Sequence, residues 1–265
     1  MKVGFIGSGN MATALAKGFM SSGKVCENEL TISDKFSKSL EKWANSQVAT
    51  TENNAEVCNN SELIILAVKP NILPDVLNEI KASSKGKLFV SIAAGVTLDT
   101  MEQTLGSDVK IIRAMPNTPA QVGCGMTVLS PNQNITDAEL KSVEDIFSGA
   151  GSTVILKEKY INAATALHGS SPAYVYMLID AMADSGLKHG IPKELGLKLA
   201  AKAVEGAAKM VMETGTHPAK LKDAVCSPGG TTIAAVLELE KGGFTTAVSS
   251  AVDACVSRAE EMSAK

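Results

Sequence analysis

The start of the chain carries the feature that most limits its possible folds, a glycine-containing turn between an apolar run and helix-forming residues. The apolar run ends at Ile6, Gly7 and Gly9 stand where a sharp turn would follow, and residues 12–19 favour a helix. Gly7 permits a turn that a Cβ would strain, Gly9 lets the main chain approach a pyrophosphate, and the small Ala12 permits close helix-on-strand packing. The helix N-terminus then favours an anion. The pattern predicts a dinucleotide-binding unit, and the alternative is a glycine-rich turn in another strand–helix–strand unit.

The charge balance argues against a polyanionic partner. The 265 residues include 25 basic and 28 acidic side chains, which give a net charge of -3 without a long run of either sign. Only 4% are aromatic, too few to line a nucleic-acid groove with stacking platforms. The longest apolar run, residues 63–68, is too short to cross a bilayer, and the chain opens on a strand rather than a charged leader. We therefore expect no nucleic-acid partner, no membrane association and a cytoplasmic protein.

The cysteines and histidines are scattered. Five cysteines form no CxxC pair, and the three histidines lack the spacing of a metal-binding helix. We expect no disulfide framework, no metal site and a reducing compartment.

Short apolar runs alternate with helical patterns up to about residue 158, which is typical of a parallel sheet covered by helices on both faces. Strands are predicted at 30–33, 48–50, 63–68, 88–92 and 109–113, with further edge strands at 127–129 and 153–156 and a helix at 137–147. Ligands of such sheets bind beyond the carboxyl ends of the strands. Loops at Lys69-Pro70, Ala94-Gly95 and residues 115–119 are therefore expected beside the glycine turn.

The end of the second predicted strand bears on cofactor preference. The residue at this position meets the adenine ribose, where an acid favours a 2′-hydroxyl and a base favours a 2′-phosphate. The chain offers Asp34 followed by Lys35, so the residues themselves leave the preference open. Asp34 as a simple cap of the following helix is an equal alternative.

Beyond about Glu158 the apolar period changes to that of helices, which predicts two domains, residues 1–158 and 159–265. Ser171 is the expected N-cap of a helix that has Pro172 just inside it. Further helices are predicted to open at Pro192 and Pro218 and to cover the region before Gly242 and residues 244–262. The long, alanine-rich helices favour a helix-exchanging dimer.

Residues 227–232 form a second glycine-containing turn, with two glycines followed by two threonines at a predicted helix start. Unpaired N–H groups, the helix dipole and a hydroxyl at the cap would make an anion cradle. An ordinary helix–helix turn is the alternative.

Several motifs, in order along nearly the whole chain, resemble the pyrroline-5-carboxylate reductase family. They are residues 5–12, 67–70 (AVKP), 93–97 (AAGVT), 113–119 (RAMPNTP), 171–174 (SPAY) and 227–232 (SPGGTT), the last being the most specific. Ser171 departs from the family's common glycine. The resemblance implies an α/β fold, with a Rossmann-type N-terminal domain and a C-terminal all-helical dimerisation domain that interlocks with a partner's.

The family also implies site residues. Cofactor contacts would come from Gly7, Ser8, Gly9, Asn10, Met11, Asn53, Ala67, Val68, Lys69 and Ala94. The substrate site would be Ser227, Gly229, Gly230, Thr231 and Thr232, with the substrate carboxylate on the N–H groups of the last three. Family members commonly prefer NADPH, which favours Lys35 as a contact of the 2′-phosphate. Asp34 leaves NADH as the alternative cofactor. Members form dimers, often as rings of five dimers, and the activity implied is reduction of pyrroline-5-carboxylate to proline.

The expected chemistry explains the lack of a catalytic dyad in the sequence. A protonated cyclic imine is already a strong electrophile, so positioning is the main task. Thr232 is the expected catalytic residue, with its hydroxyl near the ring nitrogen, and His168 as a general acid is the alternative. Two other functions compete, a hydroxyacid dehydrogenase and a non-catalytic dinucleotide sensor. Hydroxyacid dehydrogenases of the related two-domain type use a lysine and an asparagine on a helix early in the second domain, and the segment after Gly169 offers neither at that spacing. A dinucleotide sensor needs no second anion cradle.

Overall fold

The computed structural model describes residues 1–263 and divides into two compact units. The first comprises Met1–Gly169 and the stretch that begins at Cys255, and the second comprises Ser170–Ala254. The domain boundary near residue 158 stays a prediction. The compact first unit continues beyond it to Gly169 and also includes the stretch that begins at Cys255.

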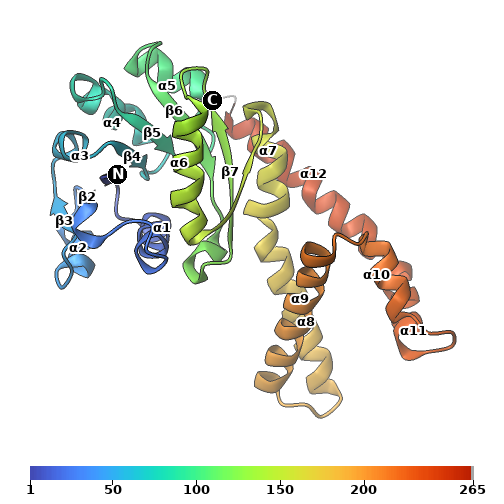
Figure 1. Cartoon of the computed structure of the whole chain (residues 1–265). Helices are drawn as coiled ribbons and strands as arrows, with labels where there is room; N and C mark the ends of the chain where they lie inside the picture. Colours follow the sequence, from blue (N-terminus) through green and yellow to red (C-terminus); the bar gives the residue numbers. More distant parts are fainter. Residues whose placement is uncertain (264–265) are drawn as a thin grey trace. The chain divides into compact units, whose positions relative to one another are not determined.

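The strands of the first unit form one sheet of eight (Figure 1). They are β1 (Val3–Ile6), β2 (Leu30–Ser33), β3 (Ala49–Thr51), β4 (Leu63–Leu66), β5 (Leu88–Ser91), β6 (Lys110–Met115), β7 (Gly125–Pro131) and β8 (Gly151–Ile155). Their spatial order is β3-β2-β1-β4-β5-β6-β7-β8, and β6–β7 is the antiparallel pair among parallel ones. The order 3-2-1-4-5-6 is that of the Rossmann fold, which confirms the expected fold class.

Helices cover both faces of this sheet. They are α1 (Asn10–Ser21), α2 (Ser37–Leu40), α3 (Asn54–Asn60), α4 (Leu73–Ile80), α5 (Leu98–Leu105), α6 (Asp137–Phe147) and α7 (Ile161–Ala164), with short turns at η2 (Glu41–Trp43) and η4 (Thr118–Val122) and a π-helical turn at η7 (Thr165–Gly169). One apolar core lies under α1 and α6, and a second under α3, α4 and α5. Of the strand predicted at residues 63–68, residues 63–66 form β4 and are buried, whereas Ala67 and Val68 follow the strand and are only half-buried.

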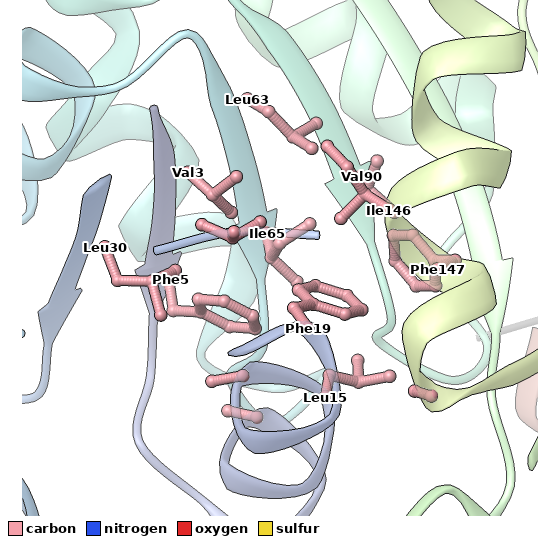
Figure 2. Packing of buried hydrophobic residues seen from close by; sticks show 14 of the residues in the cluster. Val3, Phe5, Leu15, Phe19, Leu30, Leu63, Ile65, Val90, Ile146 and Phe147 are labelled. Carbon is pink, nitrogen blue, oxygen red and sulfur yellow. The ribbon is translucent and has the colours of Figure 1, made fainter. Parts of the chain in front are cut away.

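Aromatic side chains join α1 and α6 to the sheet in the first of these cores (Figure 2). Phe19 contacts Phe5 on β1 with ring centroids 6.0 Å apart and meets Phe147 of α6 edge-on at 5.2 Å. Full burial of each such side chain stabilises the fold by about 1.5–3 kcal/mol. The start of α1, which bears the glycine turn, is therefore fixed by packing further along the same helix.

The sequence prediction placed both later strands at an edge, and this is wrong for β7. It lies between β6 and β8, with Val128 and Leu129 buried, whereas β8 forms the edge and is largely exposed. The chain turns back after η4, so β7 pairs antiparallel with β6, and the crossover through α6 then adds β8 outside it.

The second unit is built from helices, as expected. They are α8 (Ser171–Lys188), α9 (Lys193–Thr214), α10 (Pro218–Val225) and α11 (Thr231–Lys241), and α12 (Phe244–Ser263) begins in this unit. The predicted N-cap of α8 was one residue late: Ser170 holds that position and Ser171 is the first helical residue. Gly215 ends α9 with φ of 62°, a left-handed conformation that glycine adopts without strain.

Candidate functional site

The glycine turn joins β1 to α1 and leaves an open surface at the helix N-terminus. Gly7 has φ of 104°, its N–H donates to the Ser33 carbonyl over 2.8 Å, and a Cβ on it would lie 2.6 Å from the Ala67 carbonyl oxygen. Two separate features therefore require glycine at this position, namely the positive φ angle and the closeness of the Ala67 carbonyl oxygen. A Cβ on Gly9, the N-cap of α1, would meet nothing within 4 Å. The open space beside the first N–H groups of α1 fits a pyrophosphate.

A pocket of about 330 Å³ lies at this turn, at the carboxyl ends of β1, β4, β5 and β6. It is lined by Gly9, Asn10, Met11, Ala12, Ala67, Val68, Lys69, Ile92, Met115 and Pro116. Six of the predicted cofactor residues thus share one pocket with the predicted loop at residues 115–119. Ile92 was not a predicted site residue, although its place at the end of a predicted strand was a usable signal.

Ser8 is buried, and the segment after β2 binds all three of its polar groups. Its N–H donates to Asp34 Oδ2 over 2.9 Å, its hydroxyl accepts from Trp43 Nε1 over 3.1 Å, and its carbonyl accepts from Lys42 Nζ over 2.6 Å. This segment therefore holds the glycine turn in place. Lys42 and Trp43 were not among the predicted site residues, because no local pattern marks a contact to a residue 34 or 35 positions earlier in the chain.

Asp34 does not cap the following helix, which contradicts that alternative. The N-cap of α2 is Phe36, and Asp34 Oδ1 accepts the Phe36 N–H over 3.0 Å while Oδ2 holds Ser8. Lys35 is exposed, with its Nζ 3.5 Å from Glu79 Oε2. Such an exposed pair contributes little to stability, so the ammonium remains available to another anion.

Besides Gly7, Ser8, Asp34 and Lys35, two more of the predicted cofactor residues lie outside the pocket lining. Asn53 is the N-cap of α3, and its Oδ1 accepts the Ala55 N–H over 2.9 Å. Ala94 is exposed in the turn after β5. The roles given to both by resemblance stay predictions.

The predicted substrate residues gather in the second unit, at the start of α11. Gly229 has φ of 68°, and the Gly230 N–H donates to the Ser227 carbonyl over 3.0 Å, which closes the turn. The N-cap is Gly230, so the expected hydroxyl at the cap is absent: Thr231 and Thr232 occupy the first helical turn instead. The first N–H groups of a helix lack intrahelical acceptors, so this turn retains the donors that a carboxylate needs.

Within residues 1–263, no group of three or more histidine, cysteine and acidic side chains could hold a metal ion. Burial raises the pKa of Cys58, on α3, to about 11, so its thiol is neutral at ordinary pH and is no nucleophile. None of the described helices has the length and apolar content of a membrane span.

A Rossmann-type sheet with an open glycine turn, followed in the chain by a helical unit with a second glycine turn at a helix start, is typical of two-unit, dinucleotide-dependent oxidoreductases. Comparison with known proteins then identifies the family. The chain belongs to the pyrroline-5-carboxylate reductase family, as the following similarities show.

Residues 158–262 match the family model described as pyrroline-5-carboxylate reductase dimerisation, and residues 2–95 match the model for NADP oxidoreductase, coenzyme F420-dependent. The pyrroline-5-carboxylate reductase of Escherichia coli K12 is 46% identical, over 99% of this chain and 98% of the relative. That of Arabidopsis thaliana is 42% identical, over 99% and 95%. The crystal structure of Plasmodium falciparum pyrroline carboxylate reductase with NADP bound superposes with a TM-score of 0.90 at 35% identity, over 99% of this chain and 98% of that one.

Proposed function

We propose that this protein reduces 1-pyrroline-5-carboxylate to L-proline, the last step of proline biosynthesis, with NADPH as the hydride donor. It is an oxidoreductase that acts on a C=N bond. The observation that carries the proposal is the presence, in one chain of this family, of two glycine turns at helix starts. One fits a dinucleotide pyrophosphate and the other fits a small carboxylate.

The first unit would hold the cofactor. The open space above Gly9 and the N–H groups of the α1 start suit the pyrophosphate, and Ala67, Val68 and Lys69 border the pocket that continues from it. The NADP-bound Plasmodium relative and the exposed Lys35 support NADPH, with Asp34 leaving NADH possible. When bound, the reduced nicotinamide supplies the hydride.

The second unit would hold the substrate. The N–H groups of Thr231 and Thr232 bind the carboxylate and so fix the orientation of the ring, while Ser227, Gly229 and Gly230 shape the turn. The Gly230 N–H, which was also expected to bind the carboxylate, donates to the Ser227 carbonyl instead. The Thr232 hydroxyl hydrogen-bonds the ring nitrogen as the charge of the nitrogen is lost. The reaction requires that this turn, from the same chain or from another copy, reach a nicotinamide held by the first unit.

The helices of the second unit support a homodimer. Its α8 and α9 bury only Ala183, Gly196 and Ala200, and α10 and α11 bury none of their described residues. Large apolar side chains remain exposed, such as Met177 and Met212 at 73%. A second copy would cover them. We further propose that five dimers assemble into a decamer. We also propose that the enzyme is cytoplasmic.

The experiment that tests the proposal measures initial rates of NADPH and NADH oxidation with pyrroline-5-carboxylate. We expect oxidation that depends on the added imine and is faster with NADPH. A 2-ketoacid substrate serves as the control, because its reduction without pyrroline reduction would indicate a hydroxyacid dehydrogenase. Tight cofactor binding without turnover on either substrate would indicate a dinucleotide sensor.

A further inference from the structure

We propose that His168 is a positioning residue, which fixes the wall of the dinucleotide pocket formed by Met115 and Pro116. His168 Nε2 lies 2.8 Å from the Met115 carbonyl oxygen, and Nδ1 lies 2.6 Å from that of Ala164. A neutral imidazole carries one N–H and so donates to one of these two carbonyls, and we assign the hydrogen to Nε2, from which the ring donates to Met115. The inference rests on the proposed function, because this wall matters to the reaction only if the pocket holds a nicotinamide dinucleotide.

Asn117, which follows Pro116 in the chain, makes a second contact with His168. Asn117 is buried, its Nδ2 donates to the His168 carbonyl over 2.9 Å, and its Oδ1 accepts the Met126 N–H over 2.8 Å. The residues on both sides of Pro116 are therefore tied to His168. Proline has no N–H of its own to anchor it, so the position of Pro116 depends on these neighbours.

The segment that bears His168 is itself held in place by buried side chains. His168 lies in η7, the π-helical turn that continues α7. The buried side chains of Ile161 and Ala166 anchor this part of the chain. The Thr165 hydroxyl donates to the Ile161 carbonyl over 2.7 Å. Single π-turns within helices occur often at functional sites. Both ring nitrogens of His168 face main-chain carbonyls, so the geometry favours a positioning role over the proton transfer considered from the sequence.

Two substitutions separate the two ring contacts. In His168→Gln the side-chain amide nitrogen can take the place of Nε2, whereas in His168→Asn it reaches only the place of Nδ1. We expect His168→Asn to lower kcat for pyrroline-5-carboxylate about tenfold, because a shifted wall misplaces the nicotinamide ring. The NADPH Kd should stay within about twofold, since the glycine turn is untouched, and His168→Gln should retain kcat within about twofold.

The emission of bound NADPH gives a second measurement that needs no turnover. We expect it to change in His168→Asn and to match the wild type in His168→Gln, because it reports the surroundings of the nicotinamide ring. Equal behaviour of the two variants in both measurements, or a loss that appears in Kd rather than in kcat, would overturn the inference. A wild type that binds NADPH without reducing the imine would instead refute the proposed function, and the emission comparison would still decide the role of His168.

Discussion

Single residues at the two glycine turns carry requirements of different kinds. At Gly7 the requirement comes from the protein itself, because the backbone angle and the Ala67 carbonyl both exclude a side chain. At Gly9 nothing in the protein opposes a Cβ, so any requirement there comes from a ligand. Neighbouring glycines of one motif can therefore be told apart by experiment.

Gly7→Ala and Gly9→Ala form a matched pair. Gly7→Ala should lower the free energy of unfolding by at least about 2 kcal/mol, because it adds backbone strain and a steric clash. Gly9→Ala should cost less than about 1 kcal/mol without cofactor, since alanine is only a poorer N-cap. It should nevertheless weaken NADPH binding about tenfold or more, equivalent to ~1.4 kcal/mol. Urea unfolding and fluorescence titration measure the two effects, and normal NADPH affinity in Gly9→Ala would contradict pyrophosphate binding at the turn.

Thr232→Ala tests the hydroxyl in the first turn of α11. We expect kcat to fall about tenfold or more if its hydrogen bond to the ring nitrogen strengthens in the transition state. Thr232→Ser retains the hydroxyl and should keep most of the activity. Steady-state kinetics on both variants decide the point, and unchanged rates in Thr232→Ala would remove the residue from the mechanism.

At the scale of elements, the segment from Asp34 to Trp43 links two parts of the proposed cofactor site. It bears the residues expected at the adenine ribose, and it also holds Ser8 in the glycine turn through Asp34, Lys42 and Trp43. A substitution aimed at cofactor preference in this segment can therefore disturb the pyrophosphate site as well. Lys35 is the safer position to change, because it makes no contact with Ser8 among the hydrogen bonds of residues 1–263.

Lys35→Ala tests the preference for NADPH. We expect the KM for NADPH to rise about tenfold, as one charged hydrogen bond to the 2′-phosphate is lost, with little change in the KM for NADH. Glu79→Gln removes the charge of the present partner of Lys35 and serves as the control, which should not weaken NADPH binding. Equal effects of Lys35→Ala on both cofactors would contradict the assigned contact.

Local sequence patterns predicted most elements because both strands and helices carry short-range signals. Residues 30–33 and 137–147 form their predicted strand and helix with the same bounds. The interior place of β7 was missed because strand order depends on the path of the chain and not on the strand's own residues. In the site, glycines and strand ends were predictable, whereas Trp43 and His168 act through contacts formed by folding.

At the scale of the whole molecule, the exposed apolar faces of the second unit predict an obligate oligomer. Leu199 on α9 is 54% exposed, and its neighbour Lys198 is exposed too. Leu199→Asp should dissociate the protein and reduce its activity, because a buried, unpaired carboxylate disfavours the interface. Lys198→Asp introduces the same charge one position away and should leave the oligomer intact. Analytical ultracentrifugation separates these outcomes, and a wild type that is monomeric at micromolar concentration would refute the dimer.

The second unit begins after Gly169 and ends before Cys255, after which the chain rejoins the first unit. In topological terms, residues 170–254 are an insertion between two stretches of the first unit. A ribosome must therefore synthesise the whole inserted unit before the stretch from Cys255 onward can join the first unit.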